Sequence, residues 1–165
     1  MLAGFGPVHA PDARLLVLGS MPGARSLEAG EYYAHPRNAF WPIMEALFGV
    51  DAASPYVTRL EMLRAAGVAL WDVIGRCRRR GSLDQKVEPE SIVANDFGRL
   101  LADCPRIRRI GFNGGLAEQA WRRHVAPSLE PRAELEFVRL PSTSPAHAAM
   151  TLAQKTEAWR RALLG

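Results

Sequence analysis

The sequence is poor in cysteine and in long apolar runs, and each shortage excludes a class of protein. Only Cys77 and Cys104 are present, far apart and outside any Cys-x-x-Cys pair, so the chain cannot supply a four-thiolate metal cluster. No apolar run approaches the ~18 residues of a membrane-spanning helix, and the first residues lack the charged and apolar regions of a signal peptide. We therefore expect a cytoplasmic protein with no membrane partner and no metal.

Motifs for binding nucleotides and metals are also missing. The turn Gly19-Ser20-Met21-Pro22-Gly23 follows the first apolar run, but it lacks the Gly-Lys-Ser/Thr ending of a phosphate-binding loop and the Gly-x-Gly-x-x-Gly spacing of a dinucleotide fold. No His-Glu-x-x-His string or paired His/Cys spacing is present. These absences argue against nucleoside triphosphate hydrolysis and nicotinamide binding, and we expect no cofactor.

What the chain does contain is ample apolar material for a core and an excess of arginine. With 165 residues and 48 % apolar composition, a single domain over residues 1–165 is expected. The net charge of +4 points to an anionic partner, and only two of the 21 basic residues are lysines. Arginine suits bidentate phosphate contacts, although the base composition of the gene can produce the same bias. The densest basic run, residues 76–80, is therefore either part of a nucleic-acid surface or a solvated loop.

Short apolar segments alternate with helical patterns along the chain. Strands are expected at residues 14–18, 68–71, 107–112 and 135–140, after an irregular lead-in over residues 1–13. Helices are expected at residues 39–48, 55–66 and 90–103, then from the 113–115 turn through residue 121, and last up to residue 164, with a basic loop at 76–87. In the second helix Val57, Leu60 and Leu63 are predicted to face inward. Ser144 before Pro145 is interpreted as the N-cap of the last helix.

This alternation indicates an α/β fold, a three-layer α/β/α sandwich with a four-stranded, mostly parallel central sheet. Ligands bind such sheets at the carboxyl ends of the strands. Here that edge would gather residues 19–23, Asp72, residues 113–114 and residues 141–147. Its groups are amides, hydroxyls and aromatic rings with little net charge, which suits a planar, neutral, hydrogen-bonding ligand such as a nucleobase.

Three strings of residues at this edge resemble the hypoxanthine-DNA (deoxyinosine) glycosylases, a branch of the uracil-DNA glycosylase superfamily. They are Gly19-Ser20-Met21-Pro22-Gly23, Tyr32-Tyr33-Ala34-His35-Pro36-Arg37-Asn38-Ala39-Phe40-Trp41 and Leu140-Pro141-Ser142-Thr143-Ser144-Pro145. Supporting strings are Leu70-Trp71-Asp72-Val73, Gly81-Ser82-Leu83-Asp84 and Phe112-Asn113-Gly114, so the likeness covers nearly the whole chain. The resemblance implies a uracil-DNA glycosylase-like sheet between helices, and excision of deaminated bases from DNA.

Hydrolysis of an N-glycosidic bond requires a flipped nucleotide, a held water molecule and a place for negative charge on the departing base. By resemblance, Asn38 is the catalytic residue that positions the water, and a helix cap is its alternative role. The mismatch-specific branches usually carry an Asn where this chain has Met21, and a thioether cannot orient water. Backbone N–H groups of Ser20 and Met21 are expected to face the base.

The remaining candidate residues fall into two groups, those that contact the base and those that contact DNA. Tyr33 is expected to stack on the base, and Phe40 either contacts it or belongs to the core. Asp72 either accepts a hydrogen bond from the N1–H edge of hypoxanthine or caps the next turn. His147 stands where the family more often has Asn, and we include it among the catalytic residues as a group that aids base departure. The expected phosphate contacts are Arg76, Arg80, Ser142, Thr143 and Ser144.

Further features bear on subtype and on alternatives. Lys86 and Lys155 lie outside the principal strings, so a Schiff-base lyase is not expected, and the iron–sulfur branches of the superfamily would need four Cys ligands. The sequence predicts a monomeric, monofunctional enzyme acting on hypoxanthine in DNA. The alternatives are uracil as the main substrate, or a non-catalytic DNA-binding module of the same fold. Either the 76–87 loop or the region after Gly114 could fill the gap left by a flipped nucleotide.

Overall fold

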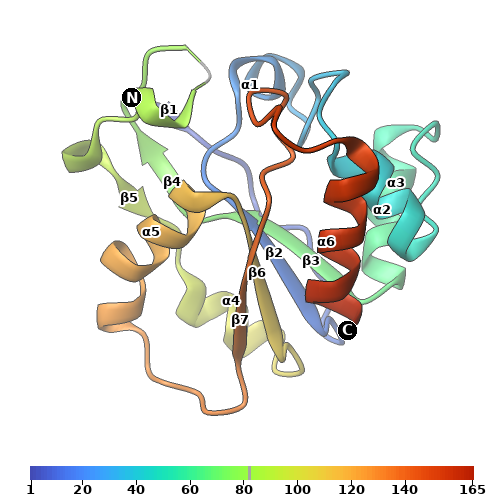
Figure 1. Ribbon diagram of the computed structural model, residues 1–165. Coiled ribbons are helices and arrows are strands. Elements are labelled where there is room, and N and C mark those ends of the chain that lie inside the picture. The colour runs from blue at the N-terminus through green and yellow to red at the C-terminus, as the bar shows by residue number, and fades with distance from the viewer. Residues whose placement is uncertain (82) are drawn as a thin grey trace.

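The computed structural model describes residues 1–81 and 83–165. Ser82, which belongs to the predicted 76–87 loop and to the 81–84 string, lies outside the described residues. The chain forms a central sheet of four strands, with helices on both faces (Figure 1). The expected three-layer α/β/α sandwich is confirmed.

The four strands of the central sheet all run parallel, in the order β3-β2-β6-β7. They are β2 (Leu15–Gly19), β3 (Val68–Asp72), β6 (Arg109–Asn113) and β7 (Glu136–Leu140). Alternate residues of β2 point to opposite faces, because Leu16 and Leu18 pack in one apolar core and Val17 in the other. Burial on both faces explains why the strand is an uninterrupted apolar run.

Three long helices cover one face of the sheet and two helices cover the other. The first group is α2 (Phe40–Phe48), α3 (Tyr56–Ala65) and α6 (Leu152–Leu164), and the second is α4 (Phe97–Asp103) and α5 (Gly115–His124). A short helix, α1 (Ala24–Ala29), follows β2 at the carboxyl edge, and 3-10 turns lie at η1 (Asp84–Lys86), η2 (Pro89–Ser91) and η3 (Ala126–Ser128). None of the helices in the described parts is long and apolar enough to cross a membrane.

A small antiparallel sheet lies beside the first and was not expected from the sequence. Its order is β1-β4-β5, with β1 (Leu2–Ala3), β4 (Ile74–Cys77) and β5 (Val93–Ala94). The predicted irregular lead-in therefore includes a strand, and the predicted 76–87 loop begins inside β4. The predicted 90–103 helix starts only at Phe97, because β5 occupies residues 93–94 and the Asp96 side chain caps α4 by accepting the N–H of Arg99 at 3.1 Å.

Two other helix predictions need correction. Val57 is 66 % exposed instead of inward-facing, because Tyr56, Leu60 and Leu63 form the packed stripe of α3. Ser144 is not the N-cap of the last helix. That helix begins at Leu152, after a capping box in which Thr151 and Gln154 bond each other's backbone N–H groups.

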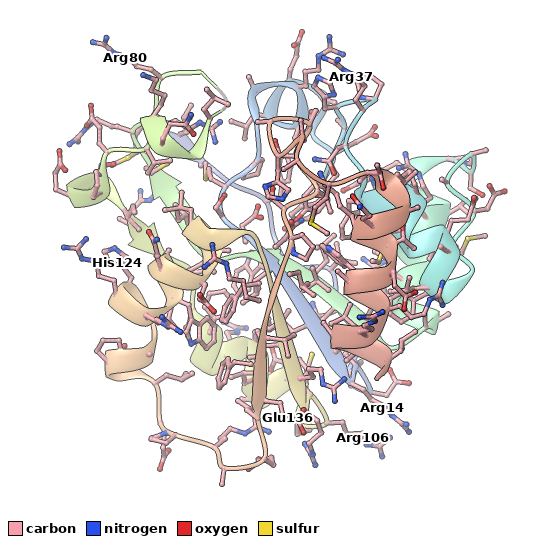
Figure 2. All side chains as sticks on the ribbon, viewed as in Figure 1. Arg14, Arg37, Arg80, Arg106, His124 and Glu136 are labelled. Atoms are coloured by element: carbon pink, nitrogen blue, oxygen red, sulfur yellow. The ribbon has the colours of Figure 1, made fainter. Side chains whose placement is uncertain are left out.

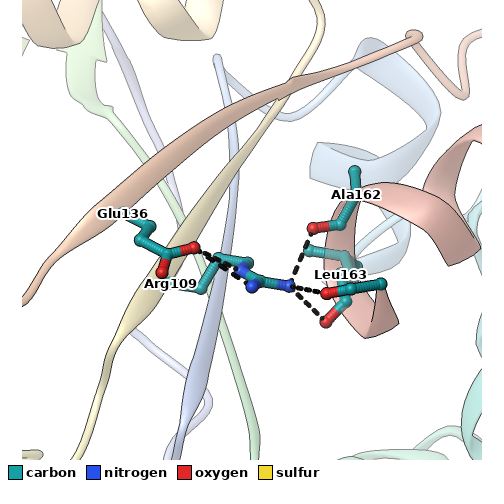
Figure 3. A network of polar contacts seen from close by, with 5 residues as sticks. Arg109, Glu136, Ala162 and Leu163 are labelled. Carbon is teal, nitrogen blue, oxygen red and sulfur yellow. Dashed lines mark hydrogen bonds and ion pairs between the residues drawn. The ribbon is translucent and has the colours of Figure 1, made fainter.

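At the amino edge of the sheet, Arg109 joins two strands to the end of α6 (Figure 3). Its Nε and Nη2 donate to Glu136 Oε2 at 3.2 and 3.0 Å. Its Nη1 donates to the carbonyl oxygens of Ala162 and Leu163, both at 3.0 Å. A guanidinium suits the unsatisfied carbonyls of a helix C-terminus, so this network fixes the end of the molecule opposite the carboxyl edge.

Candidate active site

A cavity of about 580 Å³ opens at the carboxyl edge of the central sheet, which is large enough for a nucleobase. It is lined by the turn after β2, the end of β3, the end of β6, the segment before α2 and the loop after β7. The predicted residues that line it are Ser20, Met21, Tyr33, Asn38, Asp72, Ser142, Thr143, Ser144 and His147. The topology thus brings together five segments from different parts of the sequence.

The aromatic floor of the cavity is a stack of two rings. Tyr33 lines the cavity and lies on Phe40, with ring centroids 4.1 Å apart and planes 20° from parallel. Phe40 is fully buried, with its ring against the edges of Trp41 and Trp159. Of the two roles left open for Phe40, the structure favours the core, because Phe40 lies outside the cavity and supports the Tyr33 ring.

The backbone under this floor is held in an uncommon conformation. Tyr33 has a φ of 55°, a left-handed value that non-glycine residues rarely adopt. The preceding Tyr32 is held by three hydrogen bonds: its N–H donates to Tyr56 Oη at 2.9 Å, its hydroxyl to the Gly6 carbonyl at 2.7 Å, and its carbonyl accepts Trp41 Nε1–H at 3.0 Å. Burial raises the pKa of Tyr32, which keeps its hydroxyl a proton donor. The strain at Tyr33 is thus maintained by its surroundings.

Gly19 allows the cavity wall to close around Tyr33 and Asp72. A Cβ atom at Gly19 would clash with Asp72 Oδ1 and would lie 2.8 Å from Tyr33 Oη. Asp72 is buried at the end of β3, and its carbonyl oxygen accepts Asn95 Nδ2–H at 2.7 Å. A glycine is therefore required where the two side chains approach the backbone of β2.

Asn113 joins the floor of the cavity to the loop after β7. Its Nδ2 donates to Tyr33 Oη at 3.2 Å and to Thr143 Oγ1 at 3.0 Å, and its Oδ1 accepts the N–H of Thr143 at 2.9 Å. These bonds fix which end of the amide is which. The sequence placed this residue at the edge of the sheet but assigned it no role. An amide at the end of a buried strand was the sequence feature that could have indicated a role for Asn113 in the site.

Asn38 lies one residue before the N-cap of α2, which is Ala39, so it is not the helix cap itself. Its Oδ1 accepts the N–H of Phe40 at 2.9 Å, which stabilises the start of α2, and the side chain also lines the cavity. Among the described residues, no acceptor bonds the Nδ2 group. The backbone bond therefore orients the amide and leaves its N–H donors for a ligand or a water molecule.

The loop over residues 141–147 is an irregular turn built from its own hydroxyls. Ser142 Oγ accepts the N–H of Ser144, and Ser144 Oγ accepts the N–H of Ala146, both at 3.2 Å. These bonds form short hydroxyl turns, which is why Ser144 does not start a helix. Thr143 is 1 % exposed and its hydroxyl is held by Asn113, so it acts as an internal tie instead of an exposed phosphate contact. His147 is half-buried and lines the cavity.

Besides Phe40, two more predicted residues are not part of this cavity, and residues without a predicted role join it. Arg76 and Arg80 are exposed and do not line it, and Figure 2 shows Arg80 projecting outward. Sequence reasoning missed Arg25 and His35, which do line it. His35 Nδ1 accepts the N–H of Arg37 at 3.0 Å, so its other ring nitrogen is the one that can donate.

A polar pocket with an aromatic floor, at the carboxyl edge of a parallel sheet, defines a class of α/β proteins that can hold a flat heterocycle. The comparison with known families is specific. The family model for the uracil DNA glycosylase superfamily matches residues 6–164, and the chain belongs to that superfamily.

The proteins that are similar to the chain include two curated relatives and a solved structure. Proteins named hypoxanthine DNA glycosylase from Methanosarcina barkeri and Methanosarcina acetivorans are 38 % and 36 % identical over 112 residues, which is 67 % of this chain and 70 % of each relative. A solution NMR structure of a candidate uracil DNA glycosylase from Methanosarcina acetivorans has a TM-score of 0.75 and 30 % identity, covering 96 % of both chains.

Proposed function

We propose that the chain is a monofunctional DNA glycosylase that hydrolyses the N-glycosidic bond of hypoxanthine in deaminated DNA. The observation that carries the proposal is the Asn38 amide, oriented by the helix start beside the Tyr33 ring in one cavity. Membership in the superfamily and the names of the two curated relatives support DNA as partner and hypoxanthine as the base.

In the proposed reaction the flipped base stacks on Tyr33, with its N1–H toward the buried carboxylate of Asp72. The N–H donors of Asn38 hold the water that attacks the sugar C1′ atom. The C1′–N9 bond breaks and its electron pair leaves with the base, while one water proton is released and the hydroxyl remains on C1′. Backbone N–H groups of the Ser20-Met21 turn, together with His147, are the proposed stabilisers of the departing base.

Fewer residues are proposed to contact the DNA backbone at the cavity than were predicted from the sequence. Ser142 and Ser144 line the cavity, and their hydroxyls are the proposed donors to a phosphate beside the flipped nucleotide. Arg76 and Arg80 would contact DNA only beyond the cavity, as part of a longer electrostatic surface. Lys86 and Lys155 do not line the cavity, which supports hydrolysis without a Schiff base.

The test is cleavage of duplex oligonucleotides that carry a single inosine, uracil or xanthine. We expect strand breaks at inosine after alkali and none without alkali. Cleavage at uracil alone would show that uracil, instead of hypoxanthine, is the main substrate. Binding without an abasic product on any substrate would reduce the protein to a DNA-binding module. We also propose a monomer, because residues of one chain build the cavity, and light scattering after size exclusion tests this.

A further inference from the structure

Lys155 is a buried cation beneath the loop that carries the hydroxyls of the site. It lies in the first turn of α6, is 5 % exposed and does not line the cavity. Its Nζ donates to the carbonyl oxygen of Ser144 at 3.4 Å, at the long end of the hydrogen-bond range. No role for this lysine was predicted from the sequence, and the fold brings it next to the loop of the candidate active site.

The surroundings of Lys155 do not balance its charge. An ammonium has three N–H donors, and one long bond occupies only one of them. In the described part of the chain no carboxylate lies within 4.0 Å of it, and Glu157, the acidic residue of α6, pairs with Arg160 and Arg161. Burial lowers the pKa of Lys155, and the start of a helix also disfavours a cation.

Two residues on one face of α6 hold the loop at two points. Trp159 lies one turn after Lys155, and its Nε1 donates to the carbonyl oxygen of Pro141 at 2.9 Å. Between these two bonds the loop presents Ser142 to the cavity and inserts Thr143 against Asn113. The cation is thus retained at the back of the loop segment whose front carries the hydroxyls.

We propose that Lys155 is a positioning residue for DNA binding, which holds the 141–147 loop through the Ser144 carbonyl and whose charge is balanced by a phosphate of the substrate strand. The phosphate is the one that the hydroxyls of Ser142 and Ser144 receive. The identity of the anion as DNA rests on the proposed function. The inference adds that DNA binding supplies the counter-charge that the folded chain lacks.

Lys155→Met tests this inference, because methionine keeps an unbranched apolar side chain and removes the charge. We expect the melting temperature to stay equal or rise, since replacing a buried charge with an apolar group relieves its desolvation. Affinity for an inosine duplex at low salt should fall by about tenfold, because one positive charge near the bound phosphate is lost, and the difference should shrink as salt is added. The loss should be larger in affinity than in the single-turnover rate at saturating enzyme. Lys155→Arg should restore part of the salt dependence.

Arg106→Met is the matched control, because it removes one positive charge at the opposite, amino edge of the sheet (Figure 2). A Lys155→Met protein that is less stable than the wild type but binds with the same salt dependence overturns the inference and makes the lysine merely structural. If the wild type cleaves inosine DNA and this result is obtained, only the inference fails. If the wild type binds DNA without cleaving it, the proposed function fails and the salt dependence still decides the role of Lys155. Absence of any DNA binding overturns both.

Discussion

Substitutions at Asn38 can separate its contribution to the start of α2 from its proposed role in catalysis, because the two roles use different atoms of the side-chain amide. Oδ1 accepts the N–H of Phe40 at 2.9 Å, and the cavity receives the remaining N–H donors. Asn38→Ala removes both functions. Loss of one side-chain hydrogen bond of this kind costs about 1 kcal/mol. In a domain of this size that corresponds to a fall in melting temperature of about 2–4 °C.

Asn38→Ser is the matched variant, since a serine hydroxyl forms the same turn more weakly and cannot replace the amide donors. We expect its melting temperature to lie between those of the wild type and Asn38→Ala. Both variants should bind inosine DNA, and both should lose about 100-fold or more in single-turnover cleavage, the scale of a lost transition-state donor. Melting curves, gel shifts and alkali-developed cleavage gels measure the three quantities. An Asn38→Ala protein that cleaves at the wild-type rate would refute the assignment and leave Asn38 with only its structural bond to Phe40.

Three further experiments test the packing of the site and the buried charge of Lys155. Gly19→Ala should lower the free energy of unfolding by about 1–3 kcal/mol, because the new Cβ would overpack against Tyr33, and it should weaken cleavage. Gly6→Ala is the control and should do neither, because its Cβ would meet nothing within 4 Å. Urea unfolding and cleavage assays compare the two variants. Phe40→Leu should lower the affinity for inosine DNA more than the cleavage rate at saturation, because it leaves the Tyr33 ring without its stacked support, and a titration of the single-turnover rate separates the two. Burial lowers the pKa of Lys155 in the folded state, so the unfolded chain binds more protons at alkaline pH. The difference in unfolding free energy between wild type and Lys155→Met should therefore narrow as the pH rises toward 10.5, the ordinary pKa of a lysine. A difference that stays constant with pH would contradict this.

The fold was predictable where one pattern dominated a segment. The apolar run of β2 has no good alternative to a strand buried on both faces, and Gly49, with a φ of 71°, ends α2 where the pattern predicted. The prediction that Val57 faces inward was wrong because Val57 shares helical spacing with Leu60. Only the packing of Tyr56 against the core shows which face of α3 is buried. Periodicity gives the existence of a helix more reliably than the face it buries.

The start of α6 shows how two sequence signals can compete. Ser144-Pro145 and Thr151-x-x-Gln154 are both typical of a helix start. The first closes into a turn through its own hydroxyl, and the second forms the capping box that begins the helix. A reciprocal box satisfies two backbone donors, and a single hydroxyl followed by proline satisfies one. The sequence contained the stronger signal.

The candidate site was predictable in outline because parallel strands deliver their carboxyl ends to one edge. The directions of the side chains were not. Arg76 and Cys77 are neighbours in β4, yet one is exposed and the other buried, and a run of basic residues cannot specify that alternation. Phe40 satisfied both a core pattern and a family string, and burial assigns it to the core side of Tyr33.

The bonds between the segments make the site more than a collection of strand ends. The N–H of Ala39 donates to the carbonyl oxygen of Thr143 at 3.0 Å, directly after Asn38 and in the middle of the hydroxyl loop. Thr143 is in turn held by Asn113, which also bonds the hydroxyl of Tyr33. The stacking ring, the amide at the helix start and the loop are therefore joined within two hydrogen bonds of Thr143. Because Thr143 is almost fully buried, these bonds are shielded from water and strengthened by the low local dielectric. In the proposed complex, a DNA strand whose phosphate binds the 141–147 loop would therefore contact the same hydrogen-bonded unit that positions Tyr33 and Asn38.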